Sequence, residues 1–154
     1  LEMASDYKLL GIAIQIATEA HAGQFDKGGK PYILHPLHLM TQMLFDTELA
    51  IMAVLHDVVE DSEVTLKDLE TYGFSDRVIE ALDTLTHNPL DTYEQYIARI
   101  SYNYDAIRVK RKDLQHNSDI TRLKGLREKD FKRLEKYSKA FVRLGAAKKL
   151  FEKV

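Results

Sequence analysis

Apolar residues recur at steps of three and four along several separate stretches of the chain. The first such stretch runs from Leu10 to Ala17 and ends near Gly23. This spacing places the apolar side chains on one face of a helix and leaves the polar residues between them for solvent. Ser5 or Asp6 is suited to cap this helix, because a short oxygen-bearing side chain accepts a hydrogen bond from the first free backbone N–H groups.

Breaking and capping residues divide the rest of the chain into further helices. Gly28, Gly29 and Pro31 interrupt helical structure, and Pro36 is suited to the first turn of the next helix. Later helices are expected to begin at or just after the polar residues Thr47, Thr65, Ser75, Thr92 and Asn103, and at about Asp130. No stretch alternates apolar and polar residues as a half-buried strand does. The pattern predicts an all-α fold, a single helical bundle of about seven to eight helices over residues 3–154.

The stretch 51–61, which reads I-M-A-V-L-H-D-V-V-E-D, departs from ordinary amphipathic patterning. It is mostly apolar and is expected to be a buried central helix, yet it contains His56, Asp57, Glu60 and Asp61. Removing three carboxylates and an imidazole from water is costly unless a partner neutralises them. A bound cation is the leading explanation.

Composition narrows the identity of that cation. The chain has 154 residues, 45% hydrophobic and 30% charged, which fits one soluble domain with a substantial core. It has no cysteine, so disulfides, thiolate metal sites and a cysteine nucleophile are excluded and any metal is held by nitrogen and oxygen. The net charge of −2 does not favour binding of DNA or RNA.

Positive charge is concentrated in one region. Between Arg108 and Arg133 there are ten Lys and Arg residues against four Asp and Glu. Such a run is usually a solvated helical face. The alternative is a surface whose positive electrostatic potential attracts a phosphorylated small molecule.

Four residues are candidate metal ligands. His35 stands where a loop meets the helix that opens at Pro36, His56 and Asp57 are adjacent in the central stretch, and Asp113 comes from a distant helix. Two imidazoles and two carboxylates suit Mn²⁺, Fe²⁺ or Zn²⁺. A catalytic site would leave coordination positions open for water and substrate.

The order of these residues resembles the HD superfamily of metal-dependent phosphohydrolases. The matching motifs are H-P at 35–36, H-D at 56–57, E-D at 60–61 and D-x-x-x-N at 113–117. More narrowly, A-H-A-G-Q-F-D-K-G-G-K-P-Y-I-L-H-P at 20–36 and V-L-H-D-V-V-E-D at 54–61 resemble the hydrolase domain of RelA/SpoT-type alarmone enzymes. The similarity extends over roughly residues 5 to 145.

This resemblance implies a role for each matching residue. It implies one divalent ion, typically Mn²⁺, held by His35, His56, Asp57 and Asp113. Glu60 and Asp61 match the acidic pair that handles the attacking water and proton transfer, while Lys27 and Asn117 match residues that contact the substrate. The implied reaction is hydrolysis of the 3′-diphosphate of ppGpp or pppGpp to pyrophosphate and GDP or GTP.

Two positions depart from the pattern of the long alarmone enzymes. Asp26 and Asp119 stand where those enzymes often carry arginine, and each exchange reverses a charge that could hold phosphate or stack on a base. Two alternatives therefore stay open. One is an HD phosphatase or phosphodiesterase for a different nucleotide, and the other is a non-catalytic nucleotide-sensing module.

The remaining polar and aromatic residues have simpler interpretations. Structural or surface positions are expected for the other histidines and for the tyrosines that could flank a nucleotide: His21, His38, His87, His116, Tyr32, Tyr93 and Tyr96. No signal peptide, lipidation motif or membrane-spanning run is visible, so a cytoplasmic location is expected. The expected partner is a phosphorylated nucleotide, and the sequence is compatible with a homo-oligomer.

Overall fold

The computed structural model describes residues 2–153, with side chains from residue 6 onward. This part of the chain contains nine α-helices and one 3-10 helix: α1 (Glu2–Ala20), α2 (Leu34–Thr41), α3 (Thr47–Leu55), α4 (Val58–Asp61), α5 (Leu66–Glu70), α6 (Asp76–Leu85), α7 (Tyr93–Ile100), α8 (Tyr104–Asn117), η1 (Ile120–Arg122) and α9 (Glu128–Glu152). The only pairing of the strand type among these residues is an isolated bridge between Phe25 and Pro31. The all-α prediction is confirmed, with slightly more helices than expected.

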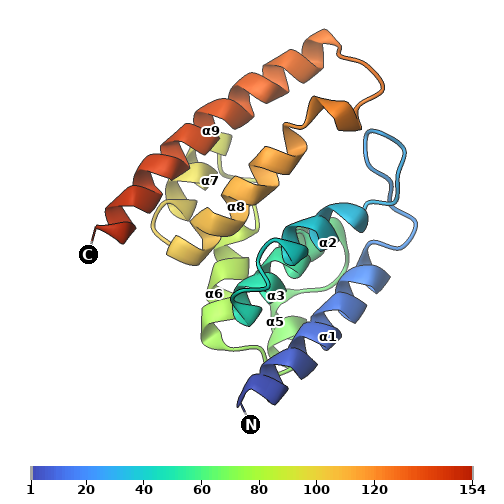
Figure 1. Ribbon diagram of the computed structural model, residues 1–154, viewed down its shortest axis with the longest axis vertical. Helices are drawn as coiled ribbons and strands as arrows, with labels where there is room; N and C mark the ends of the chain where they lie inside the picture. Colours follow the sequence, from blue (N-terminus) through green and yellow to red (C-terminus); the bar gives the residue numbers. More distant parts are fainter. Residues whose placement is uncertain (1, 154) are drawn as a thin grey trace.

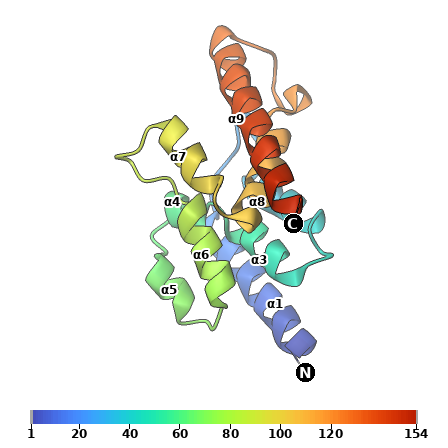
Figure 2. The same cartoon turned by 90° about the vertical axis from the view of Figure 1, so that its left-hand side faces the viewer.

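Helix α3 lies at the centre of the molecule. All its residues from Leu49 to Leu55 are buried, because α1, α2, α6 and α8 pack around it. Helix α9 lies along α8 on one side of the molecule, and α1 lies on the opposite side (Figure 1). The view turned by 90° shows α6 and α3 between α1 and the α8–α9 pair (Figure 2). The almost wholly apolar α3 is therefore the core helix against which the more polar helices pack.

Capping residues set the helix starts largely as predicted. Each of four predicted caps accepts a hydrogen bond from a backbone N–H three residues on: Thr65, Ser75, Thr92 and Asn103. The start of α1 was predicted wrongly, since the helix already runs from Glu2 and continues through Ser5 and Asp6. The residues before Ser5 are themselves good helix formers, so a potential cap does not force the helix to begin there.

The predicted central helix is not continuous. Helix α3 ends at Leu55 and α4 begins at Val58, with His56 and Asp57 between them. Asp57 has φ −109° and ψ 0°, a sparsely populated backbone conformation. In an unbroken helix neighbouring side chains diverge by about 100°. The break instead allows His56 and Asp57 to point the same way.

The apolar residues of the last helix, α9, are buried only in part. Leu144 is fully buried and Ala140 is 5% exposed, and both face the core. Phe131 is 58% exposed, so the first turn of α9 does not take part in the core. Gly145 lies against α8, where a Cβ would be 3.1 Å from the guanidinium of Arg111 and would require that side chain to shift slightly.

Candidate metal centre

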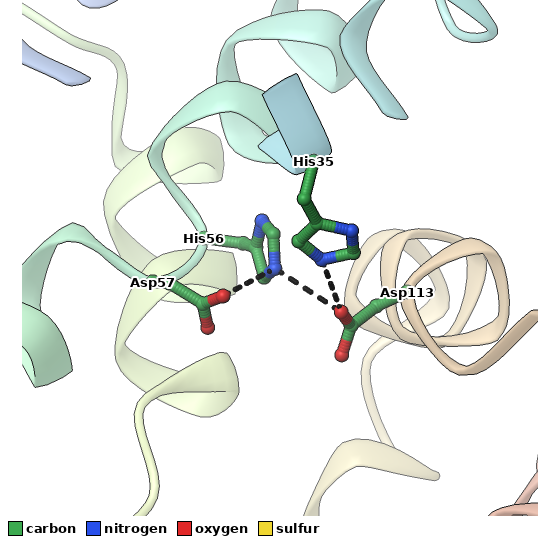
Figure 3. A group of neighbouring side chains, drawn as sticks. All are labelled: His35, His56, Asp57 and Asp113. Carbon is green, nitrogen blue, oxygen red and sulfur yellow. Dashed lines mark hydrogen bonds and ion pairs between the residues drawn. The ribbon is translucent and has the colours of Figure 1, made fainter. Parts of the chain in front are cut away.

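Three distant parts of the chain bring four candidate ligands together. His35 comes from the first turn of α2, His56 and Asp57 from the break between α3 and α4, and Asp113 from α8. One ligand atom from each of the four lies within 4.8 Å of all the others. Figure 3 shows the two imidazoles and two carboxylates converging on one small space. His35, His56 and Asp113 are at most 4% exposed.

The distances within this group are short. His35 Nε2 lies 2.8 Å from Asp113 Oδ1, and His56 Nε2 lies 2.9 Å from Asp57 Oδ2 and 3.4 Å from Asp113 Oδ1 (Figure 3). His56 Nδ1 donates a hydrogen bond to the carbonyl oxygen of Ala53 at 2.6 Å. In the neutral ring this leaves the lone pair on Nε2, which is buried and has no hydrogen-bond partner. An unpartnered lone pair that faces carboxylate oxygens fits a bound cation.

The charges of the group also favour a cation at its centre. Burial raises the pKa of Asp113, but Lys110 and the two histidines outweigh it and hold that pKa well below its usual value. Burial lowers the pKa of His56, but Asp57 and Asp113 outweigh it and raise that pKa well above its usual value. Two carboxylates that remain ionised therefore attract either a proton or a metal ion to the imidazole between them.

Three neighbouring side chains contact the candidate ligands from outside the group. Lys110 Nζ lies 2.8 Å from Asp113 Oδ2, and the hydroxyl of Tyr32 donates to Asp57 Oδ2. His116 Nδ1 lies 2.7 Å from His35 Nδ1, with the two rings stacked at 5.0 Å. The expectations that Tyr32 and His116 only pack in the structure were wrong. The spacing of Lys110 and His116, each three residues from Asp113 on one helix face, was the available signal.

The two predicted proton-transfer acids lie on α4, directly after the candidate ligands His56 and Asp57. Partial burial and the charge of Asp57 raise the pKa of both Glu60 and Asp61. Glu60 Oε1 accepts a hydrogen bond from the backbone N–H of His87, which places this turn residue against the site. A carboxylate with a raised pKa is a better base toward water at neutral pH.

A cavity of about 280 Å³ adjoins the candidate metal group. Two residues that line the cavity also contact candidate ligands. The hydroxyl of Tyr32 donates to Asp57, and Asn117 Nδ2 donates to Asp113 Oδ1 at 2.9 Å. Lys27 also lines the cavity, so both residues predicted to contact substrate lie at one pocket.

Asp26 and Asp119, the two acids that depart from the pattern of the long alarmone enzymes, line the same cavity. Asp26 Oδ1 accepts hydrogen bonds from the N–H groups of Gly28 and Lys30, each at 2.9 Å. Asp119 Oδ1 accepts hydrogen bonds from the N–H and hydroxyl of Thr121. Both carboxylates therefore shape turns in the cavity wall.

The other aromatic residues are placed mostly as expected. Tyr96 is buried, and its hydroxyl donates to the carbonyl oxygen of Leu85. His38 is exposed and stacks on His116 at 4.1 Å. His21 is 2% exposed, and its Nδ1 pairs with Gln24. None of the helices in residues 2–153 has the length and apolar composition needed to cross a membrane.

Fold and ligand group together define a helical domain with a candidate site for a divalent metal ion held only by nitrogen and oxygen. Its curated relatives are RelA/SpoT-type enzymes. The guanosine-3′,5′-bis(diphosphate) 3′-pyrophosphohydrolase of Vibrio cholerae serotype O1 is 41% identical over 71 residues, which are 44% of this chain and 10% of that protein. The enzyme of the same name from Haemophilus influenzae is 32% identical over 117 residues, which are 66% of this chain and 17% of that protein.

These comparisons confirm the resemblance to RelA/SpoT-type enzymes. The bifunctional (p)ppGpp synthase/hydrolase SpoT of Escherichia coli K12 is 41% identical over 66 residues, which are 41% of this chain and 9% of that protein. The chain thus spans less than a fifth of each of these relatives. No protein-family profile matches the chain.

A solved structure supports the fold. It is described as a metazoan ortholog of SpoT that hydrolyzes ppGpp and plays a role in starvation responses. The two share a TM-score of 0.72 at 21% sequence identity, over 88% of this chain and 84% of the other. The helical arrangement of this chain is therefore one that a solved protein adopts.

Proposed function

We propose that this chain is a metal-dependent phosphohydrolase that cleaves the 3′-diphosphate of ppGpp or pppGpp. The observation that carries the proposal is the group of His35, His56, Asp57 and Asp113, whose ligand atoms lie within 4.8 Å of one another. Curated relatives at 27–41% identity are named as guanosine-3′,5′-bis(diphosphate) 3′-pyrophosphohydrolases. In this proposal residues 3–154 form one catalytic domain that acts in the cytoplasm on a nucleotide rather than on DNA or RNA.

In the proposed site the four side chains hold one divalent ion, for which we propose Mn²⁺. Such an ion polarises a phosphoryl oxygen and lowers the pKa of water. His56 and His35 each present Nε2 toward the carboxylates, and their Nδ1 atoms are occupied by Ala53 and His116. The protein thereby orients both imidazoles before any ligand arrives.

Proton transfer is assigned to Glu60 and Asp61. The raised pKa of each makes it a suitable acceptor for the proton of the attacking water. The water oxygen ends on the released pyrophosphate, and the ribose 3′ oxygen regains a proton as GDP or GTP leaves. Lys27 and Asn117 contact the substrate in the adjoining cavity.

Two measurements test this proposal. Elemental analysis of the untreated protein identifies its metal, and chelated protein reloaded with Mn²⁺ is incubated with ppGpp while pyrophosphate and GDP are measured. We expect turnover that depends on metal and is lost in Asp57→Ala and Glu60→Gln. Intact ppGpp at ample enzyme would contradict the proposed substrate.

A second candidate function is hydrolysis of a different nucleotide, favoured by Asp26 and Asp119 in the cavity wall. A panel of nucleotides assayed separately for phosphate and pyrophosphate distinguishes the two candidates. A non-catalytic sensing module is less well supported, because a pure binding domain has little use for the Glu60–Asp61 pair beside a metal.

A further inference from the structure

A second cavity, of about 230 Å³, lies between α8, α9 and the segment that leads from α2 into α3. Figure 1 shows α8 between α9 on one side and α2 and α3 on the other. None of its described lining residues also lines the cavity beside the candidate metal group. Within the described part of the chain, its wall contains no acidic side chain and four cationic ones: Arg108, Arg111, Lys112 and Lys148.

Three of these cations share one face of α8. Arg111 and Lys112 follow Arg108 by three and four positions, so the three side chains point in similar directions. Asp113 is two positions after Arg111 and is therefore turned by about 200° around the helix axis. Helix α8 thus presents a candidate metal ligand on one side and this group of cations on roughly the opposite side.

Two of the four cations are partly neutralised. Arg108 Nη2 lies 2.7 Å from Asp105 Oδ1, and Lys148 Nζ lies 3.2 Å from Glu152 Oε2. Asp105 is shared with a second cation, since Arg77 Nε lies 2.9 Å from its Oδ2. Neither Asp105 nor Glu152 lines the cavity. The wall itself therefore carries a net positive charge.

The other two cations have no acidic partner. Arg111 and Lys112 form no ion pair with any residue from 6 to 153. Arg111 makes no side-chain hydrogen bond within these residues either, and its Nε is buried without a partner. Two adjacent cations with no acid beside them repel each other, and a bound anion would remove that repulsion.

The guanidinium of Arg111 is nevertheless held in place by packing. Its Cζ lies 4.0 Å from the centroid of the Phe141 ring on α9. Gly145, one helical turn further along α9, leaves room for the guanidinium, since a Cβ there would be 3.1 Å from Nη2. A planar group with unused donors that is already fixed loses little side-chain freedom when it binds phosphate.

The remaining lining residues indicate what accompanies the phosphate. Met43, Phe45 and Leu49 line the cavity from the side of α2 and α3. Phe45 is 76% exposed, so its ring is accessible to the uncharged part of a ligand. The volume is below the roughly 300–1,000 Å³ of sites for drug-sized ligands, which favours a small molecule over a large one.

We propose that this cavity binds a small phosphate monoester, whose phosphate group contacts Arg111 and Lys112 and whose apolar or aromatic part packs against Phe45. The positive charge at this end of the 108–133 region thereby attracts a phosphorylated small molecule rather than only facing solvent. The inference does not depend on the proposed function, because the cavity is separate from the candidate metal group. A compound bound here contacts α8 without competing for the proposed substrate cavity.

Titration with phenyl phosphate, followed by two-dimensional NMR of the arginine Nε–H groups, tests the proposal at a named atom. The protein is loaded with Zn²⁺, which suits nitrogen and oxygen ligands and has no unpaired electrons that would broaden nearby signals. The signal of Arg111 is assigned by its absence in Arg111→Lys. We expect phenyl phosphate to shift this signal to saturation, inorganic phosphate to do so with lower affinity, and phenol to leave it unchanged. A phosphate that binds only at the metal does not contact Arg111, so this signal separates the two sites.

Two variants and a matched control measure the contributions of the contacts. Lys112→Met should lose about tenfold in phenyl phosphate affinity, as expected for one charge-assisted contact. Lys149→Met removes the same charge from an exposed position next to Lys148 that does not line the cavity, and it should bind like wild type. Phe45→Ala should lower the affinity for phenyl phosphate to that for inorganic phosphate and leave the latter unchanged. The backbone amide signals and the melting temperature of each variant show whether it is folded.

Two results would overturn the proposal. One is an Arg111 signal that neither phosphate compound shifts, including the case in which only an acidic peptide shifts it. The other is equal phenyl phosphate affinity in wild type and Lys112→Met. Where ppGpp is hydrolysed, its KM should be the same in wild type and Lys112→Met, and a raised KM would place substrate phosphate here and contradict a separate site. Absence of ppGpp hydrolysis would reject the proposed function and leave the NMR result as it is.

Discussion

Nδ1 of His116 lies 2.7 Å from Nδ1 of His35, and His35 Nε2 lies 2.8 Å from Asp113 Oδ1. Two imidazole nitrogens this close require that one donates and the other accepts. As a metal ligand, His35 would need a lone pair on Nε2, and it would then carry its proton on Nδ1 and donate it to His116. Burial and the charge of Arg122 lower the pKa of His116 to about 4, which keeps that ring neutral and able to accept. His116 thus acts as a positioning residue for His35.

Replacing His116 should weaken metal binding. His116→Phe removes the acceptor and frees the His35 ring to rotate or change tautomer, so we expect a 10- to 100-fold loss of Mn²⁺ affinity. Titration of the chelated protein with Mn²⁺ or Co²⁺ measures this directly. His38→Phe is the matched control, because His38 stacks on His116 at 4.1 Å but is exposed. Unchanged affinity in His116→Phe would show that the contact does not orient His35.

Removing the metal should destabilise the fold. The candidate ligands bring two carboxylates and two imidazoles into a largely buried space, and a ligand that binds only the folded state stabilises it by about 2.7 kcal/mol at 100 times its Kd. We expect a chelator to lower the melting temperature and Mn²⁺ to restore it. In His56→Ala the melting temperature should be low and no longer respond to Mn²⁺. Identical melting curves of wild type with chelator and with Mn²⁺ would count against a bound metal.

Local sequence signals predicted the helices and the four side chains that converge better than they predicted the contacts around those side chains. Caps such as Thr65 act within three residues, so their hydrogen bonds follow from sequence spacing alone. The apolar pattern did not predict the helix break at His56–Asp57. This break depends on how α3 and α4 pack against the other elements of the site. The contact between His116 and His35 depends on how α2 and α8 pack together, which periodicity does not reveal.

Arg77 Nη2 lies 2.8 Å from Asp46 Oδ2 and its Nε lies 2.9 Å from Asp105 Oδ2, and these two ion pairs should make stability depend on acid pH. Burial raises the pKa of Asp46 and Asp105, but hydrogen bonds from Arg77 outweigh it, so both folded pKa values lie below the unfolded value of 3.8. The resulting stabilisation is present above about pH 4 and is lost as the pH falls through the folded pKa values. Arg77→Met should cost about 1 kcal/mol at pH 7, since Arg77 is more than a third exposed. Urea unfolding at pH 7 and at pH 3 should show a smaller difference between wild type and variant at the lower pH.

The pairing of Asp26 with Arg122 predicts that arginine at position 26 does not restore an alarmone-type pocket. Asp26→Arg would remove the acceptor for the N–H groups of Gly28 and Lys30 and place a cation beside Arg122. The N–H of Gly28 is partly buried and that of Lys30 is exposed, so loss of their shared acceptor costs about 1 kcal/mol. We therefore expect a lower melting temperature and no gain in ppGpp turnover. Asp26→Asn is the control, because its amide oxygen still accepts the two backbone hydrogen bonds and only the weak pairing with Arg122 is lost. The loop has little freedom to adapt, since a Cβ at Gly28 would already overlap the carbonyl oxygen of Arg122. A stable Asp26→Arg variant with faster ppGpp hydrolysis than wild type would show instead that the aspartate selects a different nucleotide.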